Sequence, residues 1–133
     1  MTSKPQKVRI RPLAQADRAG WDVLYQGYAE FYRVAQTPEM RDRVWSWLHD
    51  PAASQEGLVA EAADGQLIGL AHYRPFSRPL SATTGGFLDD LFVAPEARGS
   101  GAAEALLAEL KSIAASRGWS VVRRRQRPRA QAL

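Results

Sequence analysis

A glycine-rich turn between an apolar strand and an Ala/Leu-rich helix constrains this chain more than any other feature. The expected strand covers residues 87–93, Pro95 follows it, and Gly99 and Gly101 precede the expected helix. The first turn of a helix leaves about four backbone N–H groups unpaired, and the helix dipole places roughly half a positive charge there. Because glycine has no side chain, a ligand can approach this backbone closely. The segment therefore predicts a site for a phosphate or pyrophosphate.

Two common phosphate-binding motifs do not fit this turn. A P-loop requires Gly-Lys-Ser/Thr after its four-residue gap, and the sequence contains no such triplet. A dinucleotide fingerprint that begins at Gly99 would require glycine or alanine at position 104, which is Glu104. A lone glycine-rich helix start is also common in strand-to-helix turns that bind nothing, so the surrounding elements must decide between these alternatives.

Hydrophobic periodicity outlines the remaining elements. Helices are expected from Asp17 as N-cap, from Thr37 as N-cap with Pro38 in the first helical position, and from about Gly101 to a C-cap at Gly118. Strands are expected at residues 8–11, 58–62, 67–73, 87–93 and 119–122.

The connections between the expected strands contain turn residues. Asp64-Gly65 predicts a hairpin turn, and Pro75 and Pro79 predict a loop that continues to Gly85. The element order is strand, helix, helix, strand, strand, strand, helix, strand. It predicts an α/β fold, a three-layer α/β/α domain with a mixed, largely antiparallel sheet.

The combined pattern resembles the GNAT superfamily of N-acetyltransferases, whose motif is Arg/Gln-x-x-Gly-x-Gly/Ala after the fourth strand. The resemblance covers roughly residues 8–122, with a matching strand, Pro-Glu turn and helix around the motif. It implies acetyl-CoA as cosubstrate. The amides that would hold the CoA pyrophosphate belong to Arg98, Gly99, Ser100, Gly101, Ala102 and Ala103. The backbone that would pair with the pantetheine arm, where the fourth strand splays from the fifth after a bulge, belongs to Leu91, Phe92 and Val93.

Two adjacent carboxylates precede that backbone, and the chemistry gives them a role. An amine must attack as the free base, and with a pKa near 10.4 only about one amine in 2,500 is neutral at pH 7, a cost of ~4.6 kcal/mol. The resemblance implies an acidic residue on the fourth strand as proton acceptor. Asp90 is the preferred candidate and Asp89 the second, with at most one expected to face a given cleft because strand residues alternate. The alternative is that both are solvated or flank a bulge.

Aromatic and histidine side chains supply further candidates. Tyr28, Phe31 and Tyr32 stand where the resemblance implies an acceptor-binding wall, although aromatic residues at helical spacing also form cores. His72 is expected to be a hydrogen-bonded strand residue rather than a proton shuttle, and His49 a structural residue at a helix end. Two isolated histidines with no clustered ligands predict no metal site.

Composition narrows the class of protein. The 133 residues predict one domain, and the absence of cysteine excludes disulfides, thiolate metal sites and a cysteine nucleophile. No apolar run approaches the roughly 20 residues of a membrane span, so we expect a cytoplasmic protein without membrane contact. Five arginines within the last eleven residues account for the net charge of +4, because +4 − 5 = −1. Nucleic acid is therefore not the expected partner of the domain.

The composition changes at Arg123, which divides the chain into a domain over residues 1–122 and an arginine-rich tail over residues 123–133. The resemblance implies a further helix and closing strands after the fifth strand. We therefore expect an atypical or truncated C-terminus that lacks these elements and leaves a sheet edge open. A second protomer is one candidate to cover it, which would give a homodimer. The expected solvated tail also allows contact with nucleic acid or an acidic membrane.

The sequence thus predicts acetyl transfer from acetyl-CoA to a primary amine by direct attack. The acceptor classes left open are a small amine, a polyamine, an amino acid, and a protein lysine or N-terminus. The alternative is a catalytically weak or inactive acyl-CoA-binding domain, as a consequence of the altered C-terminus.

Overall fold

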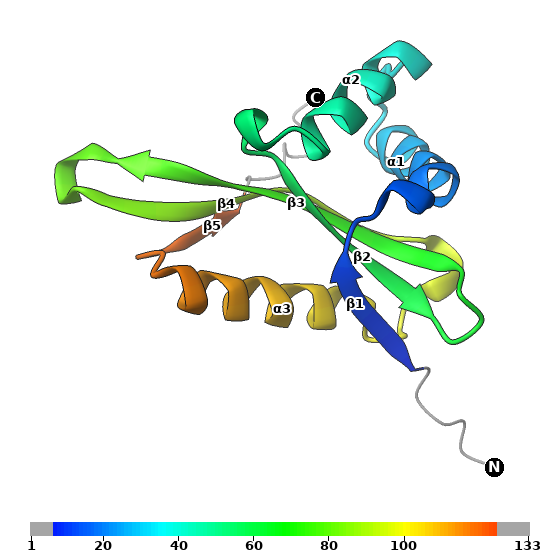
Figure 1. The fold of residues 1–133 in the computed structure, drawn as a ribbon. Helices are drawn as coiled ribbons and strands as arrows, with labels where there is room; N and C mark the ends of the chain where they lie inside the picture. Colours follow the sequence, from blue (N-terminus) through cyan, green and yellow to red (C-terminus); the bar gives the residue numbers. More distant parts are fainter. Residues whose placement is uncertain (1–6, 125–133) are drawn as a thin grey trace.

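The computed structural model describes residues 7–124 as a five-stranded sheet with helices on both faces (Figure 1). The strands lie in the order β1 to β5, with antiparallel neighbours from β1 to β4 and β5 parallel to β4. Their bounds are β1 Val8–Pro12, β2 Glu56–Ala62, β3 Leu67–Arg78, β4 Thr83–Val93 and β5 Val122–Arg124. Helices α1 (Arg18–Phe31) and α2 (Pro38–Leu48) lie on one face, and α3 (Ala102–Arg117) lies on the other. The predicted mixed, three-layer α/β fold is confirmed.

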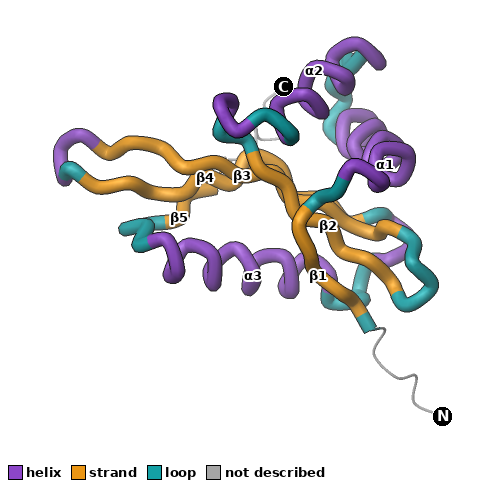
Figure 2. Tube along the Cα trace, viewed as in Figure 1, coloured by secondary structure: helices purple, strands orange, loops and turns teal. Residues whose placement is uncertain are grey.

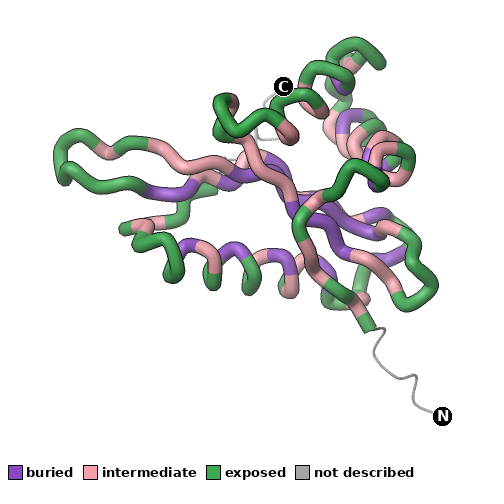
Figure 3. Tube along the Cα trace, viewed as in Figure 1, coloured by how far each residue is buried: buried purple, intermediate pink, exposed green. Residues whose placement is uncertain are grey.

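The core lies between the central strands and the inner faces of α1 and α3 (Figure 3). On α3 the buried residues recur every four positions, at Ala102, Leu106, Leu110 and Ala114, which is the period of one helix face. On the opposite face of the sheet Trp21 of α1 is completely buried. Full burial of a leucine side chain contributes roughly 1.5–3 kcal/mol, so this packing fixes α3 against the sheet.

The three predicted cap positions, Asp17, Thr37 and Gly118, are confirmed. Thr37 Oγ1 accepts a hydrogen bond from the Met40 amide at 3.1 Å, with Pro38 in the first helical position. Gly118 ends α3 in the left-handed region, at φ +70°. Asp17 is the N-cap residue of α1, although its side chain accepts no hydrogen bond from an amide of that helix.

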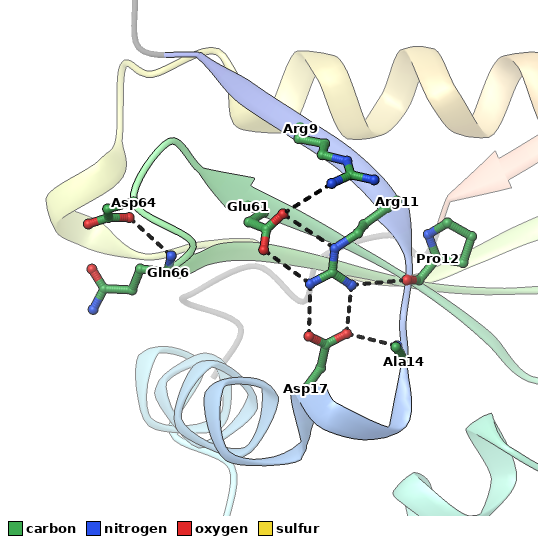
Figure 4. A network of polar contacts seen from close by, with 8 residues as sticks. All are labelled: Arg9, Arg11, Pro12, Ala14, Asp17, Glu61, Asp64 and Gln66. Atoms are coloured by element: carbon green, nitrogen blue, oxygen red, sulfur yellow. Dashed lines mark hydrogen bonds and ion pairs between the residues drawn. The ribbon is translucent and has the colours of Figure 1, made fainter.

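Asp17 instead takes part in an ion-pair network that connects the first strand to the first helix (Figure 4). Its carboxylate accepts two hydrogen bonds from the Arg11 guanidinium, at 2.8 and 2.9 Å, and one from the Ala14 amide at 2.7 Å. Arg11 also reaches Glu61 on β2 at 3.4 Å. Asp17 thus occupies the predicted N-cap position of α1, but its carboxylate binds the Arg11 guanidinium, a charge-assisted bidentate partner, rather than an amide of that helix.

The loop predicted from Pro75 to Gly85 is also wrong. Strands β3 and β4 continue as one long hairpin, with Pro75 opposite Gly86 and a turn at Pro79–Ser81 (Figure 2). Tyr73 is the last β3 residue that pairs with β2, so Pro75 lies where β3 has become an edge strand. A residue without an N–H group is tolerated at an edge, which explains why proline does not end this strand.

The last strand begins later than predicted, at Val122 rather than residue 119. The Trp119 side chain lies over Gly86, so close that a Cβ on this glycine would be 2.3 Å from the ring. Arg123 and Arg124 belong to β5, whereas the rest of the predicted tail lies outside the described residues. Within residues 7–124 no helix has the length and apolar character needed to cross a membrane.

Candidate active site

A groove of about 520 Å³ runs between the end of β4, the glycine-rich turn and the start of α3. It is also lined by Phe31 and Tyr32 at the end of α1 and by Arg124 of β5. All nine residues predicted to bind the cofactor line it: Leu91, Phe92, Val93, Arg98, Gly99, Ser100, Gly101, Ala102 and Ala103. The structure thus brings the strand and turn candidates into one place.

The glycine-rich turn presents its backbone to this groove. Gly99 and Gly101 have φ values of +86° and +88°, a region that disfavours any residue with a side chain, and the space beside each is open. Ser100 Oγ accepts a hydrogen bond from the Ala102 amide at 3.3 Å, at the first residue of α3. Within residues 7–124 no acceptor is found for the amides of Gly99 and Gly101. These donors and the positive end of α3 suit the turn to an anion.

The exposed edge of β4 supplies a second set of backbone groups. The Ala94 amide donates to the Ile68 carbonyl at 2.9 Å, which makes Ile68 and Ala94 a hydrogen-bonded pair of the β3–β4 ladder. Such pairs alternate with non-bonded ones, so Leu91 and Val93 direct their N–H and C=O groups away from β3. In the described part of the chain β5 pairs with β4 only from Gly86 to Leu88. The peptide groups of Leu91 and Val93 therefore face the groove.

A β-bulge places both candidate carboxylates on the same face of the sheet. On β4, Asp90 lies opposite His72 and Leu88 lies opposite Tyr73, which leaves Asp89 as an extra residue. Asp90 contacts His72 and Asp89 contacts Arg74, two positions apart on β3. The bulge interrupts the alternation of side chains, which brings both carboxylates to this face. The expectation that at most one of them faces a given cleft stays a prediction.

Asp90 is buried in a polar network that ends on α1. Its Oδ2 accepts hydrogen bonds from the Tyr25 hydroxyl at 2.9 Å and from His72 Nδ1 at 2.8 Å, while His72 Nε2 accepts one from the Trp21 indole at 2.9 Å. Because Nε2 is an acceptor, the imidazole is neutral with its proton on Nδ1. His72 is therefore a hydrogen-bonded strand histidine, as predicted.

The ionisation of this network follows from its contacts. Burial alone would raise the pKa of Asp90, but hydrogen bonds from His72, Tyr25 and Tyr28 outweigh it and hold that pKa below its usual value. Burial and the charge of Asp90 raise the pKa of Tyr25 far above its usual value, so Tyr25 remains a phenol that donates. Sequence reasoning missed Trp21 and Tyr25 here, although their spacing of four residues placed them on one helix face.

Asp89 lies in a more open setting. It accepts a hydrogen bond from Gln55 Nε2 at 3.0 Å and from Arg74 Nε at 3.1 Å, and its side chain is 25% exposed. The Arg74 guanidinium lies over the Phe87 ring, 4.7 Å from its centroid, and remains 40% exposed. The two carboxylates thus differ in access: Asp90 is enclosed and Asp89 is reachable.

Of the aromatic candidates, Phe31 and Tyr32 line the groove, whereas Tyr28 is not among its lining residues. Tyr28 packs edge-on against Phe92, with ring centroids 5.7 Å apart, and Tyr32 contacts Tyr28 at 4.9 Å. Phe31 lies 5.1 Å from the Arg98 guanidinium, beside the glycine-rich turn. Their role as an acceptor wall stays a prediction. The His49 ring packs at a tilt against Trp45, with ring centroids 4.4 Å apart, and no cluster of metal-ligating side chains occurs within residues 7–124.

Known proteins share this sequence pattern and fold. The chain matches the Acetyltransferase (GNAT) family over residues 21–133. It is 30% identical over 112 residues to the uncharacterized N-acetyltransferase YhfO of Bacillus subtilis (strain 168), covering 84% of this chain and 73% of that protein. It is 24% identical over 117 residues to the D-amino-acid N-acetyltransferase HPA3 of Saccharomyces cerevisiae, covering 87% and 73%. A crystal structure of ribosomal-protein-alanine N-acetyltransferase from Brucella melitensis biovar Abortus 2308 is similar with a TM-score of 0.76 and 27% identity, covering 89% and 79%.

Proposed function

The chain belongs to the acetyltransferase (GNAT) family, and from this premise we propose that it transfers the acetyl group of acetyl-CoA to a primary amine. The observation that carries the proposal is the groove, in which an anion-binding helix start and an unpaired strand edge meet. A ligand that carries a pyrophosphate at one end and an amide-containing arm at the other matches both features.

The cofactor contacts follow from these two features. The amides around Gly99 and Gly101 would hold the pyrophosphate of acetyl-CoA, supported by the dipole of α3. The peptide groups of Leu91 and Val93 would pair with the amides of the pantetheine arm, as an added strand pairs with a sheet edge. This binding mode places the thioester near the bulge that contains Asp89.

The proposed reaction is a direct transfer without a covalent enzyme intermediate. The neutral amine nitrogen attacks the thioester carbon, the carbon–sulfur bond breaks, and CoA leaves as a thiolate while the amine loses a proton. A thiol has a pKa near 8.5, so the thiolate is a tolerable leaving group without a dedicated acid. The demanding step is the removal of the proton from an amine with a pKa near 10.4.

We propose Asp89 as the group that accepts this proton, directly or through water, and Asp90 as the second candidate. Asp89 is reachable, whereas Asp90 is enclosed by Tyr25 and His72, whose hydrogen bonds hold its pKa below the usual value. In this assignment Asp90 holds the two neighbouring side chains in place.

A release assay with thiol detection tests the proposal. Acetyl-CoA and a panel of primary amines should give CoA thiol and acetylated amine in equal amounts. Asp89→Asn should lower kcat at least tenfold, whereas Glu109→Gln, on the exposed side of α3, should leave it unchanged. Thiol release that does not depend on added amine would contradict the proposal. Acetyl-CoA binding without any release would favour the alternative, a catalytically inactive acyl-CoA-binding domain.

A further inference from the structure

The ion pair between Asp89 and Arg74 has an open side. Arg74 Nε donates a hydrogen bond to Asp89, and within residues 7–124 the two Nη atoms of Arg74 have no hydrogen-bond partner. Asp89 Oδ2 accepts a hydrogen bond from Gln55. In the described part of the chain, Asp89 Oδ1 accepts one only from Arg74 Nε, at 3.3 Å. A guanidinium has five N–H donors and a carboxylate oxygen has two lone pairs. Both groups therefore retain hydrogen-bonding capacity.

The pair is held rigidly enough to recognise a ligand. The Arg74 guanidinium rests on the Phe87 ring at 4.7 Å, and the Asp89 carboxylate is fixed from its other side by the Gln55 amide at 3.0 Å. A guanidinium with a planar support loses less conformational entropy when it binds a carboxylate. Arg74 thus provides an oriented anion-binding edge beside the proposed proton acceptor.

We infer that the acceptor is a free amino acid, whose amine is bound by Asp89 and whose carboxylate is bound by the Nη edge of Arg74. This inference rests on the proposed function and adds the class of substrate to it. An α-amino acid carries its ammonium and carboxylate groups on one carbon, so the two charges are as close together as those of a contacting ion pair. The zwitterion and the pair form four alternating charges, which is electrostatically favourable.

The charges around the pair disfavour the other acceptor classes. Arg123 of β5 lies 5.8 Å from the Phe76 ring on the same hairpin, and Arg78 binds Ser120 at 2.8 Å. The acid Glu56 pairs with Arg117 of α3 at 2.6 Å, on the opposite face of the sheet. A polyamine would therefore meet uncompensated cations. A protein N-terminus has a neutral amide in place of the free carboxylate, so it lacks the negative charge that Arg74 would bind.

Acceptor pairs that differ only in the carboxylate test the inference. Phenylalanine and 2-phenylethylamine form one pair, alanine and ethylamine another, with both enantiomers of each amino acid. In the wild-type protein kcat/KM should be at least tenfold higher for the amino acid. Arg74→Gln should bring the ratio close to one, chiefly by raising KM for the amino acid. Arg78→Gln, on the same strand, is the matched control and should keep the wild-type ratio.

Binding of products makes the test independent of turnover. With CoA present, calorimetry should show N-acetylphenylalanine binding at least tenfold more tightly than N-acetyl-2-phenylethylamine, and Arg74→Gln should remove the difference. Equal kcat/KM or equal Kd within a pair would overturn the inference, as would the absence of binding by both products. The proposed function fails on a different result, namely no binding of acetyl-CoA and no amine-dependent thiol release.

Discussion

Gly86→Ala probes the packing of Trp119 against β4. A Cβ at Gly86 would lie 2.3 and 2.5 Å from two carbons of the Trp119 ring. Carbon atoms pack at about 3.5–4.0 Å, so the ring would have to retreat by roughly 1.2 Å or more. The ring cannot swing freely, because the Trp119 amide donates to Ala114 and Arg117 stacks over the indole.

The cost follows from this overlap. Overpacking of a core costs about 1–3 kcal/mol, and a rigid ring places this case in the upper half, at about 2–3 kcal/mol. With an unfolding entropy of roughly 2.1 cal/mol/K per residue over 133 residues, Tm should fall by about 7–11 °C. Since the Gly86 amide donates to Val121 just before β5, movement of the indole should also shift β5 and weaken acetyl-CoA binding.

Thermal unfolding, followed by circular dichroism, measures the effect against a matched glycine. Gly57 also lies in a strand, but its nearest neighbours are methyl groups of Leu13 and Leu48 at 3.4 Å. Gly57→Ala should therefore keep or slightly raise Tm, because alanine loses less backbone entropy on folding. A Gly86→Ala protein that unfolds within about 1 °C of the wild type, a small fraction of the expected shift, would refute this reasoning.

Three further predictions concern the glycine-rich turn, the β1 network and the buried histidine. Ala103→Glu adds a negative charge in the groove, so the Kd of acetyl-CoA should rise at least tenfold, whereas exposed Ala108→Glu should not change it. Hydrogen bonds from Arg11 are the main cause that lowers the pKa of Asp17, so this pair stabilises the fold above pH ~4, the unfolded pKa, and the contribution is lost as pH falls below it. Arg11→Gln should flatten the acid side of the stability–pH curve, and an unchanged curve would count against the network. Nitrogen NMR of His72 should show a proton on Nδ1 and none on Nε2 at neutral pH; the opposite tautomer would contradict the network.

The sequence was sufficient to predict the layers of the fold and the residues that line the groove. Strand alternation, helix caps and the glycine-rich turn are local signals, and each lies within a few residues of the structure it determines. Thr37, Gly118 and the Asp64-Gly65 turn all behave as their chemistry predicts. The nine groove residues are contiguous or nearly so in the chain, so their proximity follows from one strand–turn–helix unit.

The sequence was insufficient where distant segments decide a local conformation. Pro75 can continue β3 because β3 pairs with β2 only as far as Tyr73, which no local pattern reveals. Asp89 and Asp90 share a face because β3 opposes the pair with one residue fewer. The hydrogen-bond chain through His72 needs Trp21 from a helix 51 positions away in the sequence. Each case depends on pairing between strands or layers rather than on propensity.

Titration of acetyl-CoA during thermal unfolding tests the central claim most directly. A ligand at about 100 times its Kd adds roughly 2.7 kcal/mol to the free energy of unfolding. For a chain of 133 residues this corresponds to a rise in Tm of about 10 °C. We expect the Tm to rise by this amount and to saturate. In Ala103→Glu the same rise should require a higher concentration of acetyl-CoA. A cooperative transition whose Tm does not move at millimolar acetyl-CoA would contradict the assignment of the groove.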